Sequence, residues 1–132
     1  IKPNVAIVTD VCHETSSPCY TASKEGEHVA GQGGVITRAP AVHNKLRQLV
    51  IDLATKKEIP FQLAASSRST GTDTESFAYS NGGVPSVLIS LPLKYMHTTC
   101  ETCHKDDVEN VIKLIYNTLL NIKENHNFKY NS

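Results

Sequence analysis

The chain has 132 residues, of which 39% are hydrophobic, a size and composition that suit one compact domain with a modest core. Thirteen basic and thirteen acidic side chains give a formal net charge of zero. There is no basic stripe, so we expect no nucleic-acid partner. The apolar runs have the length of strands, far below the roughly 20 residues that span a bilayer, so we expect no membrane partner either.

The first half of the chain predicts two strands, a long loop and a helix. Residues 5–9 form a short apolar run with a polar end, which is typical of a buried strand. Residues 11–31 carry no apolar period and predict a loop. A second short strand is expected at 35–38. A helix is expected at 40–57, because Pro40 suits a first helical turn and apolar residues follow at helical spacing.

The second half predicts two more strands and two helices. A third strand is expected at 61–65 and a short helix at about 75–80, which two glycines then stop. The fourth and most apolar strand is expected at 84–91. The last helix follows, and its apolar positions fall on one predicted buried face: Val108, Val111, Ile112, Ile115, Leu119 and Ile122.

Alternating strands and helices predict an α/β fold with a mixed, largely parallel β-sheet flanked by helices. We expect residues 1–124 to form this unit and residues 125–132 to be a polar, frayed tail. In such folds chemistry gathers beyond the carboxyl ends of the strands. Three polar groups follow predicted strands, namely Asp10, Gly71-Thr72-Asp73 and His97, so we expect them at one edge of the sheet.

The carboxylate of Asp10 and the imidazole of His97 are candidate metal ligands. Each also has a structural interpretation, since Asp10 could cap a turn and His97 could be a half-buried histidine bonded to backbone. Glu101 could orient His97 by accepting its second ring N–H, or it could be a solvated charge. Asp73 could bind substrate or form an Asx turn. We expect no function for the other histidines, and that expectation is weakest for His13, which lies near Asp10.

The four cysteines are too few to indicate a disulfide scaffold, so we expect reduced thiols in a cytoplasmic protein. Two alternatives remain open. One is a structural zinc site at Cys12, Cys19, Cys100 and Cys103. The other is a zinc or redox site at Cys100 and Cys103, which precede the last helix with CxxC spacing.

Several motifs in succession resemble those of the dinuclear metallo-aminopeptidases of the glutamyl-aminopeptidase and cellulase M family, which includes the tetrahedral aminopeptidases. The family's order is Gly-Thr-Asp, then Gly-(Val/Ile)-Pro, then Pro-(Leu/Ile)-(Arg/Lys)-Tyr-Met-His. Here it corresponds to Gly71-Thr72-Asp73, Gly83-Val84-Pro85 and the run Pro92-Leu93-Lys94-Tyr95-Met96-His97. The segment from Asp10 to Pro18 resembles an upstream family motif, and the resemblance extends to about Ile122.

The resemblance implies the C-terminal part of a metal-dependent aminopeptidase with a zinc-dependent exopeptidase-like core that is incomplete in this chain. Asp10 and His97 would each bind one of two divalent ions, zinc or cobalt, and Glu101 matches a glutamate that supports the histidine. The loop Gly71-Thr72-Asp73 matches a segment beside the substrate cleft.

The resemblance also implies that no catalytic residue lies in this chain, because the general-base glutamate belongs to a preceding N-terminal part. Peptides would be the substrates, the N-terminal remainder of the same protein would be a partner, and the full-length protein would be a homo-oligomer. The chain alone would be inactive. The alternative function is a non-catalytic α/β binding or assembly module.

Overall fold

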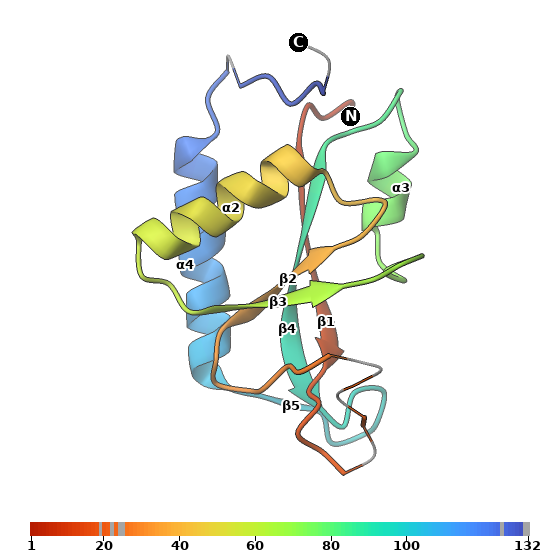
Figure 1. Ribbon diagram of the computed structural model, residues 1–132, viewed down its shortest axis with the longest axis vertical. Helices are drawn as coiled ribbons and strands as arrows, with labels where there is room; N and C mark the ends of the chain where they lie inside the picture. The colour runs from red at the N-terminus through yellow and green to blue at the C-terminus, as the bar shows by residue number, and fades with distance from the viewer. Residues whose placement is uncertain (19, 22, 24–25, 125, 131–132) are drawn as a thin grey trace.

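The computed structural model describes residues 1–132 apart from 19, 22, 24–25, 125 and 131–132. One sheet and three helices organise this part of the chain (Figure 1). The strands are β1 (Ala6–His13), β2 (Gly34–Arg38), β3 (Phe61–Ala65), β4 (Ser86–Lys94) and β5 (Thr102–Cys103). The helices are α2 (Asn44–Lys56), α3 (Thr74–Ala78) and α4 (Lys105–Asn121).

The sheet is mixed, with the strand order β1-β4-β2-β3 and with β5 paired to β4. Strand β1 runs parallel to β4, and β2 runs parallel to β3, whereas β2 and β4 are antiparallel. This confirms the predicted α/β fold with a mixed sheet flanked by helices. The carboxyl ends of β1 and β4 therefore share one edge of the sheet, and those of β2 and β3 lie at the opposite edge. The prediction that residues 71–73 follow a strand at the same edge as Asp10 and His97 is wrong.

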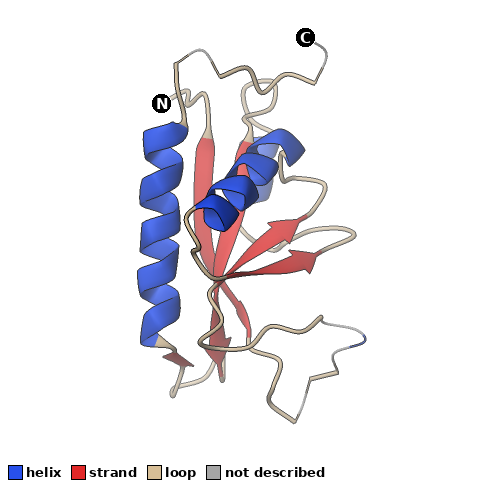
Figure 2. Cartoon of the chain, turned by 60° about the vertical axis from the view of Figure 1, so that its left-hand side comes forward, coloured by secondary structure: helices blue, strands red, loops and turns tan. Residues whose placement is uncertain are grey.

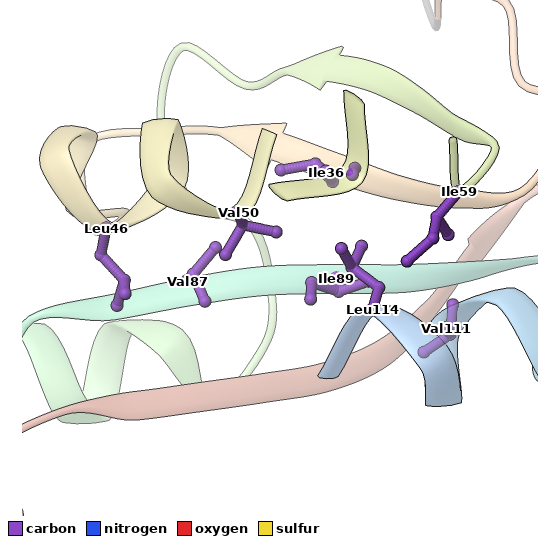
Figure 3. Packing of buried hydrophobic residues seen from close by; sticks show 9 residues of the cluster. Ile36, Leu46, Val50, Ile59, Val87, Ile89, Val111 and Leu114 are labelled. Carbon is purple, nitrogen blue, oxygen red and sulfur yellow. The ribbon is translucent and has the colours of Figure 1, made fainter. Parts of the chain in front are cut away.

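The main core lies between the sheet and the pair α2 and α4, which pack against each other (Figure 3). Each fully buried aliphatic side chain there contributes about 1.5–3 kcal/mol. The labelled side chains of this cluster are Ile36, Leu46, Val50, Ile59, Val87, Ile89, Val111 and Leu114. On the other face of the sheet, Phe77 of α3 packs against Val8 and Leu88. The two faces are thus covered by different helices.

Several predicted boundaries differ from the structure. Helix α2 begins at Asn44 rather than Pro40, because residues 39–42 form a turn and the His43 side chain caps the helix by accepting the Leu46 N–H. Strands β1 and β4 are longer than predicted, because their pairing continues from Ala6↔Ser86 to His13↔Leu93. Strand pairing, which local composition does not record, sets these ends.

Helix α4 turns a different face to the core than its apolar pattern predicts. The buried residues are Asp107, Val111, Leu114 and Thr118. In contrast, Ile112 is 60% exposed and Leu119 is 59% exposed. The predicted buried face is therefore wrong at these positions, and an apolar stripe of α4 remains uncovered.

Tyr130, in the predicted tail, lies against the start of α2. The Tyr130 ring stacks on His43 with centroids 4.5 Å apart, and the Asn44 N–H donates to the Tyr130 hydroxyl at 3.0 Å. Residues 125 and 131–132 of the predicted tail lie outside the described residues. None of the helices in the described part of the chain is long and apolar enough to span a membrane.

Candidate metal centre

Asp10 lies inside β1, opposite Ser90 of β4, rather than at the end of the strand as predicted. Its Oδ1 accepts the backbone N–H of Val11 at 2.8 Å, and the residue is half-buried. Side chains alternate along a strand, so Asp10 points to the same face as Val8, the face that α3 covers. The carboxylate is thus held on a rigid strand and keeps access to solvent.

His97 follows β4 in a tight turn. Its φ is 65° and that of Tyr95 is 57°, a left-handed conformation that few non-glycine residues adopt. The Thr98 N–H closes the turn by donating to the Tyr95 carbonyl at 3.1 Å. Such strain is typical of functional sites. The imidazole is exposed at the shared carboxyl edge of β1 and β4.

Glu101 holds this turn through the backbone. Its Oε1 accepts the His97 backbone N–H at 2.5 Å. The carboxylate therefore fixes the conformation of the turn, and through it the position from which the imidazole extends. The predicted bond from Glu101 to the His97 ring remains a prediction.

The structure adds two residues that sequence reasoning missed. The His13 ring lies 6.3 Å from the His97 ring, centroid to centroid, in an edge-on arrangement. The Tyr20 hydroxyl is hydrogen-bonded to His13 Nδ1 at 2.6 Å. The sequence signal was the position of His13 three residues after Asp10, which made the expectation of no function weakest for His13.

Burial and nearby carboxylates raise the pKa of the Cys12 thiol in β1. Burial, followed by the charges of Asp10 and Asp107, raises the pKa of the Cys12 thiol to about 12. The thiol is therefore protonated at neutral pH, and it is a poor metal ligand in that form. Cys100 and Cys103 are exposed free thiols at β5, and Cys19 lies outside the described residues.

The loop 69–73 enters α3 on the face to which Asp10 points. Glu75 anchors the loop, accepting the Thr70 N–H at 2.6 Å and the Thr70 hydroxyl at 2.9 and 2.8 Å. Burial by itself would raise the pKa of Glu75, but the hydrogen bonds from Thr70 outweigh it and hold the pKa below its usual value. The Asp73 carboxylate is exposed and makes no cap bond to α3, so it is available to a ligand.

A buried carboxylate ties α4 to the glycine loop before β2. Asp107 accepts the Gly31 N–H and the Gly33 N–H, both at 2.7 Å. It is fully buried. Asp107 therefore holds the first turn of α4 against the loop that leads into β2.

The described placements of Asp10 and His97 do not by themselves make a metal site. In the described residues, no three His, Cys, Asp or Glu side chains are grouped so that they could hold a metal ion by themselves. No interaction there joins the Asp10 carboxylate to the His97 ring. The donors suit zinc or cobalt chemically, since carboxylate and imidazole are usual ligands of such ions. The set is incomplete without further ligands.

Comparison with known proteins identifies the family. The M42 glutamyl aminopeptidase family matches residues 1–114. The chain belongs to this family. The lysyl aminopeptidase of Pyrococcus furiosus is 36% identical over 116 residues, which cover 86% of this chain and 32% of that protein. A putative aminopeptidase of Acetivibrio thermocellus is 34% identical over 118 residues, which cover 87% of this chain and 34% of that protein. This M42 chain thus spans about one third of the length of its curated relatives.

Solved structures agree with the fold of this M42 chain. A TET aminopeptidase from a marine sediment archaeon of the Thaumarchaeota has a TM-score of 0.84 and 26% identity, and the match covers 92% of this chain and 34% of that chain. The aminopeptidase APDkam598 of Desulfurococcus kamchatkensis has a TM-score of 0.83 and 28% identity, and the match covers 92% of this chain and 35% of that chain. The Pyrococcus horikoshii TET1 peptidase has a TM-score of 0.63 and 27% identity, and the match covers 89% of this chain and 33% of that chain. That peptidase is described as able to assemble into a tetrahedron or a large octahedral shell.

Proposed function

We propose that this chain is the C-terminal part of a dinuclear metallo-aminopeptidase that removes N-terminal residues from peptides, with Asp10 and His97 each holding one of two divalent ions. One observation carries the proposal. In a chain of the M42 family, these two ligand-type side chains come from β1 and from the turn that follows its parallel neighbour β4. Zinc or cobalt at such a site would supply Lewis acidity and a water of lowered pKa.

Three residues of the chain have a defined part in this proposal. Asp10 presents its carboxylate from a rigid strand, and His97 presents its imidazole from a strained turn that Glu101 holds. Rigid placement of ligands keeps an ion in one position during turnover. The general base is expected in the preceding part of the protein, so this chain contributes ligands and support rather than proton transfer.

The experiment is to substitute the imidazole in the full-length protein. His97→Ala should leave one ion fewer per subunit, measured by plasma mass spectrometry, and should abolish nearly all hydrolysis of an aminoacyl p-nitroanilide. The matched control is His104→Asn, which removes an exposed imidazole near the site but keeps an acceptor at the N-cap of α4. A His97→Ala protein with full metal content and normal turnover would overturn the proposal.

We further propose that Gly71, Thr72 and Asp73 line the substrate cleft. The support is the loop itself, which Glu75 anchors while the Asp73 carboxylate stays exposed. Asp73→Asn should raise KM for peptide substrates with little change in kcat, because the metal ligands are untouched. A fall in kcat at unchanged KM would argue against a binding role.

The 132 residues alone should not hydrolyse peptides, because the described part of the chain lacks a complete ligand set. The remaining ligands and the general base would come from the preceding part of the protein. We also propose that the full-length protein is a homo-oligomer, as the TET1 relative is. Localisation in the cytoplasm stays a prediction.

A further inference from the structure

His13 and Tyr20 form a hydrogen-bonded pair at the end of β1, close to His97. Strand β1 ends at His13, and Figure 2 shows loops gathered beyond that end of the sheet, away from both chain termini. The Tyr20 hydroxyl is bonded to His13 Nδ1 at 2.6 Å, and the two rings lie 4.9 Å apart, centroid to centroid. Neither residue has a part in the proposed ligand set. The pair nevertheless holds an imidazole at the edge of the sheet that carries His97.

Several hydrogen bonds fix this pair in place. The Glu14 N–H donates to the Leu93 carbonyl at 2.8 Å, which holds the end of β1 against β4. Glu14 is only 1% exposed, and its Oε2 accepts the Ser17 hydroxyl at 3.4 Å. The Tyr20 N–H in turn donates to the Ser17 carbonyl at 3.1 Å. The loop is therefore tied to a buried side chain at the point where it returns Tyr20 to His13.

The length of the bond between Tyr20 and His13 indicates which atom donates. N–H donors usually lie about 2.7–3.2 Å from their acceptor, whereas O–H donors lie about 2.5–3.0 Å away. The distance of 2.6 Å therefore favours the Tyr20 hydroxyl as the donor and His13 Nδ1 as the acceptor. In a neutral imidazole the proton is then on the other nitrogen, Nε2. No hydrogen bond to His13 Nε2 is found in the described part of the chain, so this N–H is available to a ligand.

The His13 ring lies beside the ring that is proposed to hold an ion. The His13 and His97 centroids are 6.3 Å apart at an interplanar angle of 75°, which is an edge-on contact. A bond between zinc and imidazole is only about 2.0–2.1 Å long, so a molecule bound by an ion on His97 stays close to this pair of rings. A protonated Nε2 has no free lone pair and cannot be a ligand itself. His13 is therefore suited to contact a molecule at the ion rather than the ion.

A peptide substrate offers one kind of backbone group to such a donor. Its protonated amino terminus and its amide N–H groups are themselves donors, whereas its carbonyl oxygens are acceptors. The scissile carbonyl is the one that approaches the ions, because metal-assisted hydrolysis requires its oxygen to be polarised. This oxygen gains negative charge as water attacks. A donor at that position therefore stabilises the transition state more than it stabilises the bound substrate.

We propose that His13 donates its Nε2–H to the scissile carbonyl oxygen of the peptide substrate, and that Tyr20 is a positioning residue that fixes the donating tautomer. This contact rests on the proposed function, because an ion on His97 is what brings the substrate there. It adds to that function a group that touches substrate and is not a metal ligand. The same chain would then supply both ligands and a donor for the developing charge.

The test uses the full-length protein and substitutions that differ in where a donor stands. His13→Ala removes the donor, and it should lower kcat for an aminoacyl p-nitroanilide about 100-fold or more with little change in KM. His13→Gln places an amide NH2 near the position of Nε2 and should keep kcat at least about tenfold above that of His13→Ala. His13→Asn reaches only the position of Nδ1 and should behave as His13→Ala. The matched control His104→Asn, at the N-cap of α4, should keep the normal kcat.

Two measurements separate this role from metal binding and from general damage to the site. All His13 variants should keep the metal content of the wild type, measured by plasma mass spectrometry, because Nε2 is not a ligand. A phosphinic dipeptide analogue carries the tetrahedral oxygen of the transition state, and calorimetry should show that His13→Ala binds it about 100-fold more weakly. A simple alkylamine has no such oxygen and should bind equally well to the variant and the wild type.

A double-mutant cycle tests the positioning role of Tyr20. Tyr20→Phe keeps an aromatic ring beside His13 but removes the hydroxyl, so it should lower kcat about twofold to tenfold. In the His13→Ala background the same substitution should have no further effect, because the group that it positions is gone. An equal loss in both backgrounds would mean that Tyr20 supports the loop alone, and it would overturn the positioning role.

The other outcomes overturn the contact with substrate. Loss of an ion in His13→Ala would make His13 a metal ligand, and a rise in KM at unchanged kcat would place it at a distant part of the peptide. Equal kcat values for His13→Gln and His13→Ala would exclude a donor. A metal-loaded His13→Ala with normal turnover would refute the inference while leaving the proposed function intact. A wild-type protein that binds no metal and hydrolyses no peptide would instead refute the proposed function, and the contact would fall with it.

Discussion

The turn that carries His97 depends on one carboxylate, and this dependence can be measured. Glu101 accepts the His97 backbone N–H, and two residues of the turn have positive φ. In the full-length protein, Glu101→Ala should weaken the binding of one ion about tenfold or more, the effect expected when the support of a ligand is lost. Glu101→Gln keeps an acceptor oxygen and should lose much less affinity in a chelator competition titration. Equal losses in the two variants would mean that the charge, rather than the hydrogen bond, matters.

The cysteines should differ in reactivity because of their surroundings. Burial and the nearby carboxylates of Asp10 and Asp107 raise the pKa of Cys12 to about 12, whereas Cys100 and Cys103 are exposed. Iodoacetamide at pH 8 should therefore alkylate Cys100 and Cys103 and leave Cys12 unmodified until the chain unfolds, as read by peptide mass spectrometry. A chelator should not change this order. Rapid labelling of Cys12 in the folded chain would contradict the assigned environment.

At the scale of elements, Asp107 joins the first turn of α4 to the loop that leads into β2. Asp107→Ala would leave the buried Gly33 N–H and the partly buried Gly31 N–H without their acceptor, at about 1–3 kcal/mol for the buried donor and less for the other. We expect a loss of about 2–5 kcal/mol in the free energy of unfolding, measured with urea. Asp107→Asn keeps one acceptor oxygen and should lose about half as much. A change within experimental error in Asp107→Ala would show that the loop finds other partners.

The same loop also depends on the close approach of its backbone to β3. A Cβ on Gly33 would lie 2.0 Å from the Pro60 carbonyl oxygen, and the residue has a φ of +94°. Gly33→Ala should therefore cost more than about 4 kcal/mol of stability. Gly71 has a φ of +70° but nothing within 4 Å, so Gly71→Ala should cost only about 1–2 kcal/mol of strain. Similar unfolding midpoints for the two variants would contradict this contrast.

Sequence pattern and structure agree where the information is local. The apolar run and short length of β3 were sufficient to predict its bounds exactly as found, Phe61–Ala65. The antiparallel step between β2 and β4 was not predictable, because it depends on contacts between distant residues. Because of this antiparallel pairing, β3, the strand before the loop 71–73, ends at the opposite edge of the sheet from His97. Likewise, the apolar stripe of α4 gave no sign of which part this chain alone covers.

The candidate site divides in the same way. The types and order of Asp10 and His97 could be read from the motifs, and the structure places Asp10 in β1 and His97 in the turn after β4, the strand next to β1. The contact of His13 with His97 and the hydrogen bonds from the glycine loop to Asp107 could not be predicted from the sequence, because both join segments that are far apart in the chain. Local motifs therefore identify candidate ligands, whereas the supporting contacts require the fold.

At the scale of the whole molecule, one buried and one half-buried histidine link stability to pH. Burial lowers the pKa of both His28 and His43 below the ordinary value of 6.5. In the unfolded chain these groups take up protons first as the pH falls below about 6.5, so the unfolded state is favoured and stability decreases. The carboxylates of Glu14 and Glu75 act in the same direction. Burial opposes their ionisation, but hydrogen bonds from Ser16 and Thr70 outweigh it, so their pKa values lie below 4.5.

Thermal unfolding measured from pH 7 to pH 3 should therefore show stability lost in two steps, one below about pH 6.5 and one below about pH 4.5. His43→Asn keeps an acceptor for the N-cap of α2 and removes one titrating group, so it should flatten the first step and leave the second unchanged. Glu75→Gln should flatten only the second step. Stability that rises as the pH falls from 7 to 5.5 would contradict the lowered pKa values of the two histidines. Charged histidines that are paired in the folded chain would give that opposite slope.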